Sequence, residues 1–368
     1  MGRTIALVGA LHPAAGALAL ALEDDPGVER VLGLSRHEPP LLGPKFEFVQ
    51  VGPGDPTFAG TLAGAETVVL FPLVDAADRN EEGRRNRVLE GTRHTLEAAA
   101  GAATVVLWSS GVVYGAHPDN PVPITEDQPL RPNPEFPAAG VLADSERLAL
   151  EAALGEGTAV VVLRGAGVWT PAWGTFLSRS LMAPAMVGVQ GQDPPRQCLA
   201  PADAVSALVL ATSGRLRGVY NVAPDDWIGA RDAARAAGLG RRRLQVPQRI
   251  AQVTAERLQR AGVSAATPGE LAYHLHPWVL DNARLRQSGW APTRSSAEAF
   301  TEAGGQVPDG VLVGGVQVRR SDIYRGAVAG LALAAAAVAV ARRQARASRS
   351  TRPATRRPAS RRPPASPM

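Results

Sequence analysis

The chain has 368 residues, of which 45% are hydrophobic and 20% charged, so it can bury a sizeable core and is not a disordered chain. Its single cysteine, Cys198, excludes an intrachain disulfide framework and a CxxC metal site. The net charge of +5 includes nine arginines and no acidic residue in 342–368, which leaves −4 for the rest. We therefore do not expect the core to bind nucleic acid.

No charged-then-apolar signal peptide opens the sequence, so we expect the bulk of the chain to fold in the cytoplasm. Lys45 is the lone lysine among 39 basic residues. Any mechanism that needs a lysine at another position is excluded.

Short apolar runs alternate with helix-prone stretches. The expected strands are Thr4–Gly9, Val31–Leu34, Phe46–Val51, Thr67–Phe71, Thr104–Trp108, Ala159–Leu163 and Gly218–Val222, and the expected helices include Ala14–Leu22, Thr57–Ala63 and Glu82–Ala100. Strands separated by helices predict βαβ units and an α/β, Rossmann-like, doubly wound parallel sheet. A ligand crevice is expected at the carboxyl ends of its strands.

The first strand-to-helix turn is where a dinucleotide would place its pyrophosphate. Gly9 opens this turn, but His12 and Ala15 stand where a GxxGxxG pattern has its other two glycines. Gly16 compensates if the loop is one residue longer. The alternative is a tight turn that binds no nucleotide.

Arg36 follows the second strand, where an acidic residue would bind the ribose of NAD. An arginine there favours a cofactor with a 2′-phosphate, such as NADP, although it is equally explained as a surface arginine. The candidate cofactor-binding residues are Gly9, His12, Gly16 and Arg36.

A sharper pattern begins at the strand that ends in Ser109 and Ser110. The ordered motifs are Val105–Gly115, Pro123–Asp127, Leu130–Pro132, Arg164 before Val168–Trp169, Tyr220–Ala223, Trp278–Arg284 and Gly289–Pro292. Their order resembles the extended short-chain dehydrogenases/reductases, the NAD-dependent epimerase/dehydratase family, over about residues 3–303.

The resemblance implies a Rossmann domain over residues 1–304 that binds NAD or NADP. A smaller substrate-binding part, at about 165–304, would take a nucleotide sugar or another small alcohol or ketone. Ser109 and Arg164 become candidate substrate-binding residues. Many relatives form homodimers through two long helices, here 82–100 and 143–154.

The family's catalytic residues are a strand Ser or Thr, a Tyr that transfers the proton and a Lys four residues later. Ser110 matches the first, but Ala138 replaces the tyrosine and Leu142 replaces the lysine. Without them the crevice lacks both a phenol of tunable pKa and a cation beside the ribose. Val88, Pro53 and Pro72-Leu73 are further departures at cofactor positions.

Other titratable groups near the expected site could carry the chemistry, with the solvated side chain as the alternative for each. They are His12, His94, His117, Glu135 and Asp144. The sequence contains no Ser-His-Asp order, no HExxH and no cluster of metal ligands, so we expect no metal site.

Residues 305–320 form a predicted linker, 321–341 an apolar helix and 342–368 a disordered Arg/Pro-rich tail. The uncharged run 326–341 rises about 24 Å, less than the roughly 30 Å hydrocarbon core. An interfacial helix with the arginines on anionic lipid fits better than a span, because a span would move nine arginines outward. The alternative is packing on protein. We therefore expect a cytoplasmic protein attached to the membrane through this helix.

Three functions follow. The preferred one is a catalytically degenerate family member that binds a nucleotide or sugar-like ligand, or a partner, near the membrane. The second is an active NAD(P)-dependent epimerase, dehydratase or reductase with an unusual proton donor such as His12, His117 or water. The third is a membrane-associated structural adaptor.

Overall fold

The computed structural model describes residues 2–39, 43–72, 80–152, 157–182, 186–239, 243–247, 268–308, 310–313 and 316–319. The chain divides into two compact units, Met1–Pro308 and Asp309–Met368. The predicted apolar helix and tail, 321–368, lie outside the described residues.

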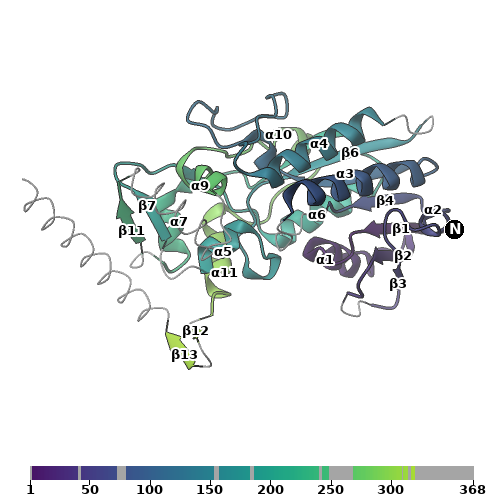
Figure 1. Ribbon diagram of the computed structural model, residues 1–368, viewed down its shortest axis with the longest axis horizontal. Helices are drawn as coiled ribbons and strands as arrows, with labels where there is room; N and C mark the ends of the chain where they lie inside the picture. Colours follow the sequence, from purple (N-terminus) through teal and green to yellow (C-terminus); the bar gives the residue numbers. More distant parts are fainter. Residues whose placement is uncertain are drawn as a thin grey trace, which may run out of the picture. The chain divides into compact units, whose positions relative to one another are not determined.

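The first unit is built on a seven-stranded parallel sheet of order β3-β2-β1-β4-β5-β6-β9 (Figure 1). Its strands are β1 (Arg3–Val8), β2 (Val28–Ser35), β3 (Phe46–Gln50), β4 (Thr67–Leu70), β5 (Thr104–Ser110), β6 (Ala159–Gly165) and β9 (Gly218–Val222). The predicted Rossmann-like α/β fold is confirmed. The prediction ended the fifth strand at Trp108, whereas β5 pairs with β6 as far as Ser110–Gly165.

Alternation along β1 shows why helices cover both faces of the sheet. Ile5 and Leu7 belong to one fully buried cluster, and Ala6 and Val8 belong to the other. The first cluster includes residues of α1 (Pro13–Leu22) and α6 (Pro201–Ala211), and the second includes residues of α2 (Phe58–Leu62), α3 (Glu81–Ala98) and α4 (Pro137–Glu151). Because successive side chains of a strand point to opposite faces, a central parallel strand is apolar on both.

The remaining described elements of the first unit contribute short strand pairs and helices, mostly after β6. The helices are η1 (Gly111–Tyr114), η2 (Pro171–Trp173), α5 (Phe176–Met182), α7 (Ala230–Ala236), α9 (Pro268–Leu275), α10 (Ala283–Gln287) and α11 (Ser296–Gly305). The strand pairs are β7 (Met186–Val189) with β11 (Arg243–Val246), and β8 (Pro195–Arg196) with β10 (Ile228–Gly229).

In the second unit, β12 (Gly310–Val313) and β13 (Val316–Arg319) pair antiparallel, within the segment predicted to be a linker. Among the described helices of the chain, none is long and apolar enough to cross a membrane.

Candidate functional site

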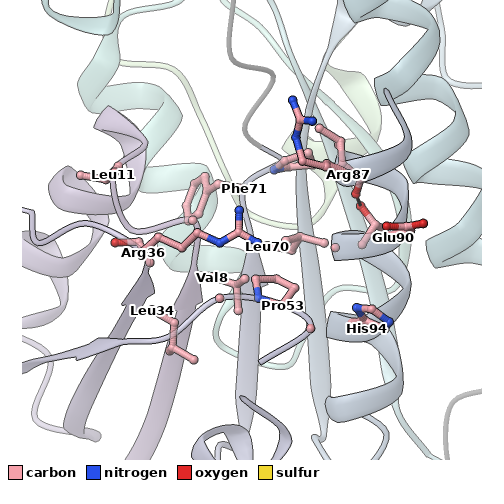
Figure 2. Close-up of a pocket in the computed structure, with 18 of the residues that line it drawn as sticks. Val8, Leu11, Leu34, Arg36, Pro53, Leu70, Phe71, Arg87, Glu90 and His94 are labelled. Atoms are coloured by element: carbon pink, nitrogen blue, oxygen red, sulfur yellow. Dashed lines mark hydrogen bonds between the residues drawn. The ribbon is translucent and has the colours of Figure 1, made fainter. Parts of the chain in front are cut away.

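A cavity of about 670 Å³ lies at the carboxyl ends of β1, β2 and β4 and against α3 (Figure 2). We call it the arginine cavity, because Arg36, Arg84 and Arg87 line it together with a single carboxylate, Glu90. It lies where β1 has neighbours on both sides, β2 and β4, which is the switch point at which α/β sheets bind ligands. The positive charge of Arg36 favours an anionic ligand there.

Arg36 directly follows β2, as predicted, and is exposed. Its Nε lies 3.0 Å from the point where a Cβ on Gly52 would stand, so the side chain lies against bare backbone (Figure 2). Within the described part of the chain, no carboxylate forms an ion pair with Arg36. Its charge is therefore available to a ligand.

One wall of this cavity was predicted from the sequence only in part, through Val88 and His94. Its residues share one face of α3 at helical spacing: Arg84, Arg87, Val88, Gly91 and His94. This i, i+3, i+4, i+7 pattern is visible in the sequence, but which strand edge the face covers is not.

Gly9 opens the first turn in the left-handed region, with φ of 86°. A Cβ on Gly9 would stand 2.5 Å from the carbonyl oxygen of Phe71, so only glycine fits at this close approach. Gly16 lies inside α1, which begins at Pro13. The extra residue of loop that would have let Gly16 serve the turn is therefore absent, and that expectation is wrong.

His12 is the N-cap of α1, and its Nδ1 accepts a hydrogen bond of 3.1 Å from the backbone N–H of Ala14. A cap of this kind contributes about 1 kcal/mol. The other donors at this helix end are also used, because the N–H of His12 binds Gly9 and that of Ala15 binds the His12 carbonyl. Pro13 has no N–H. The turn that was expected to bind a pyrophosphate thus offers few donors.

The imidazole of His12 is held by aromatic neighbours. It stacks on Phe71 with ring centroids 5.2 Å apart and meets Trp173 edge-on at 5.9 Å. Burial lowers the pKa of His12 to about 4, so the ring is neutral at pH 7. Since an amide N–H can only donate, Nδ1 carries the lone pair and Nε2 the proton.

A second cavity of about 350 Å³ lies on the other side of this ring. We call it the aromatic cavity, because His12, Phe71, Trp108, Phe136, Trp173 and Phe176 line it. Ser110, Ala138 and Leu142 share this lining, so the positions at which the resemblance expects the tyrosine and lysine lie in the same cavity as the serine. Among the described residues of this lining, His12 is the one whose side chain ordinarily titrates near neutral pH, and burial lowers its pKa to about 4.

Ser110 makes only long hydrogen bonds, donating to the Gly165 carbonyl at 3.5 Å and accepting from the Val112 N–H at 3.4 Å. The two buried tyrosines near it are engaged elsewhere: Tyr114 donates to Asn221, and Tyr273 donates to the Val112 carbonyl. No distant phenol hydrogen-bonds to Ser110 among the described residues.

Ser109 and Arg164, the candidate substrate-binding residues, belong to a buried network instead. Ser109 donates to Glu146 at 2.5 Å, and Arg164 pairs with the same carboxylate at 2.7 Å. Arg164 also donates to the hydroxyl of Tyr114 at 2.7 Å. Ser109 lines the aromatic cavity, with its hydroxyl engaged by Glu146. Arg164 lines neither cavity, so it supports the site from behind.

The other titratable candidates do not meet Ser110. His94 lines the arginine cavity, whereas His117, Glu135 and Asp144 line neither cavity. His117 Nε2 hydrogen-bonds to the Arg131 carbonyl at 2.7 Å, and Asp144 pairs with Arg147 at 2.8 Å. No cluster of metal-ligating side chains occurs in the described ranges.

A dinucleotide that spans both cavities does not fit these residues. The two linings share only Phe71 and Pro72, and the His12 ring stacks on Phe71 at that junction. The second glycine of a GxxGxxG turn lets the backbone approach a pyrophosphate, and His12 occupies that position. The residues at this junction therefore do not fit a bound nicotinamide.

No protein-family model matches the chain. Two curated proteins described as uncharacterized, from Mycobacterium tuberculosis and Mycobacterium bovis, are each 29% identical over 317 residues, which is 82% of this chain and 83% of theirs. These relatives extend over most of the chain but carry no assigned activity.

Solved structures with the same arrangement include UDP-galactose 4-epimerase (21% identity, TM-score 0.61) and MoeE5 in complex with UDP-glucuronic acid and NAD (21%, 0.62). Another is the dTDP-glucose 4,6-dehydratase DesIV from Streptomyces venezuelae with NAD bound (19%, 0.63). Each covers 83% of this chain, and 98%, 98% and 96% of its own length is matched. The chain therefore has the extended short-chain dehydrogenase/reductase fold of the NAD-dependent epimerases and dehydratases, as the sequence motifs predicted.

Proposed function

We propose that this protein is a catalytically degenerate member of the extended short-chain dehydrogenase/reductase family that binds a phosphorylated nucleotide ligand. One observation carries the proposal: Ala138 and Leu142 line the same cavity as Ser110. A phenol and an ammonium group at these positions would supply and tune the proton in a fold of this kind.

The remaining titratable group of the aromatic cavity cannot replace them. At neutral pH His12 is uncharged, and its only basic nitrogen already accepts the Ala14 N–H. It can donate a hydrogen bond through Nε2 but does not act as a general base. This argues against the second function, an active enzyme with His12 as its proton carrier, and His117 lies in neither cavity.

Ligand binding is supported by the arginine cavity. Its volume suits a nucleotide, and its arginines suit phosphate groups. The solved structures of this fold that hold NAD or UDP-sugars support a nucleotide as the ligand class.

The test is calorimetric titration of the full chain with adenosine phosphates, NAD(H) and NADP(H), followed by an assay for oxidation or epimerisation of nucleotide sugars. Binding without turnover is the expected result. Turnover that is lost in S110A would overturn the degenerate assignment, and the absence of binding by every nucleotide would overturn the ligand class.

A further inference from the structure

We infer that the arginine cavity selects a phosphorylated adenosine and excludes the nicotinamide half of a dinucleotide, because His12 closes the passage into the aromatic cavity. The inference rests on the proposed function and names its ligand more narrowly.

A row of aromatic rings lies where the linings of the two cavities meet, at Phe71. The imidazole of His12 lies nearly parallel to Phe71, at an interplanar angle of 18°, and perpendicular to Trp173, at 76°. Trp173 in turn meets Trp108 edge-on at 6.3 Å. A ligand that extends from the arginine cavity past Phe71 must displace the His12 ring.

Displacing the His12 ring also removes the N-cap of α1. The Ala14 N–H would lose its acceptor, since His12 Nδ1 is the atom that caps it. Pro13 supplies no second donor to hold a diphosphate at this point. The turn thus lacks both the space and the hydrogen bonds with which a GxxGxxG turn holds a pyrophosphate.

The arginine cavity by itself is complete for a smaller ligand. Arg36 follows β2 and carries no ion pair with any described residue, and it stands where a 2′-phosphate on adenosine is bound in this type of fold. Arg84 and Arg87 add positive charge from α3. Adenosine 2′,5′-bisphosphate contains these elements without a nicotinamide.

The experiment compares adenosine 2′,5′-bisphosphate with NADP⁺ on the full chain by calorimetry, in the wild type and in H12N. Asparagine keeps an N-cap acceptor but removes the ring. H276A is the control, because His276 lines neither cavity. Tryptophan fluorescence is recorded in parallel, since a nicotinamide that enters the aromatic cavity meets Trp108 and Trp173.

In the wild type and in H276A we expect the dissociation constants of the two ligands to lie within about threefold of each other. NADP⁺ should not quench the tryptophan fluorescence. In H12N, the affinity for NADP⁺ should rise about tenfold, or about 1.4 kcal/mol, and NADP⁺ should quench the tryptophan fluorescence. The affinity of H12N for adenosine 2′,5′-bisphosphate should equal that of the wild type. Unchanged binding of this ligand also shows that the arginine cavity of the variant is folded. If H12N does not fold, H12A replaces it.

Wild-type NADP⁺ binding more than about tenfold tighter than the bisphosphate, or an equal gain for both ligands in H12N, would overturn the inference. The proposed function fails in a different way, with neither ligand binding to any variant.

Discussion

Arg164 on β6 and Glu146 on α4 form an ion pair of 2.7 Å in which both side chains are almost fully buried. Ser109 donates a hydrogen bond to Glu146, and the Tyr114 hydroxyl accepts one from Arg164. The network therefore connects α4 to β6 and to β5, the strand that carries Ser110. Of the two residues that the sequence marked as substrate contacts, Arg164 holds the site in place from outside both cavities, and Ser109 lines the aromatic cavity.

Removal of one partner of this pair should destabilise the protein strongly. We expect E146A to lower the free energy of unfolding by about 3–5 kcal/mol, because it leaves the Arg164 charge buried and uncompensated. The double variant E146L/R164M should lose much less of the free energy of unfolding, since it leaves no buried charge. Urea denaturation followed by circular dichroism measures both. Equal losses in the single and double variants would show that packing, not charge, dominates.

The stability of the protein should fall below neutral pH in part through His12. Its folded-state pKa of about 4 lies below the ordinary value of 6.5, so its contribution is full above pH 6.5 and declines as the pH falls toward 4. Between pH 7 and pH 5 the wild type should lose about 2 kcal/mol more than H12N. Denaturation at both pH values checks this, with H117A as the control. The prediction would be contradicted if the free energy of unfolding of H12N fell between pH 7 and pH 5 by as much as that of the wild type.

Arg36 should confer the preference for a 2′-phosphate. A charge-assisted hydrogen bond is worth about 1.5–3 kcal/mol, so R36A should weaken adenosine 2′,5′-bisphosphate binding by roughly ten- to a hundredfold. Adenosine 5′-monophosphate should lose little. R30A is the matched control, because Arg30 lies on β2, the strand that Arg36 follows, and pairs with Glu47 at 3.4 Å. Calorimetry that gave equal losses for both ligands would assign Arg36 a general electrostatic role.

The two cavities should respond separately to substitution. A138Y/L142K returns a phenol and an ammonium group to the aromatic cavity, and neither position lines the arginine cavity. We expect the double variant to bind adenosine 2′,5′-bisphosphate as the wild type does. A changed affinity in calorimetry, with an unchanged thermal midpoint, would mean that the ligand reaches the aromatic cavity.

The C-terminal segment remains a prediction from the sequence, since 321–368 lie outside the described residues. If its apolar run and arginines attach the protein to anionic lipid, deletion of 321–368 should release the protein from the membrane fraction. Replacement of the nine arginines in 342–368 by glutamine separates charge from the apolar run. Full-length protein that is recovered without membranes would contradict the attachment.

The fold could be predicted from the sequence because it depends on local patterns. Alternation of apolar runs and helices predicted the parallel sheet. Ala138 and Leu142, which the family resemblance indicated, line the same cavity as Ser110. These features need no knowledge of partners distant in the chain.

The site was predicted less completely, because burial and partners decide it. Nothing near Arg164 in the sequence reveals that Glu146 neutralises it, and a loop histidine such as His12 is usually solvated. In the structure His12 is held by Ala14, Phe71 and Trp173, two of which come from other elements. Long-range packing of this kind leaves no periodic pattern in a single sequence.

Phe71 belongs to the linings of both cavities, and this shared wall has a thermodynamic consequence. A ligand in one cavity that moves the Phe71 ring changes the affinity of the other cavity for its own ligand. Linkage requires the effect to be reciprocal and of equal size in both directions. The catalytically degenerate protein that we propose would thereby report the binding of one small molecule through its affinity for another.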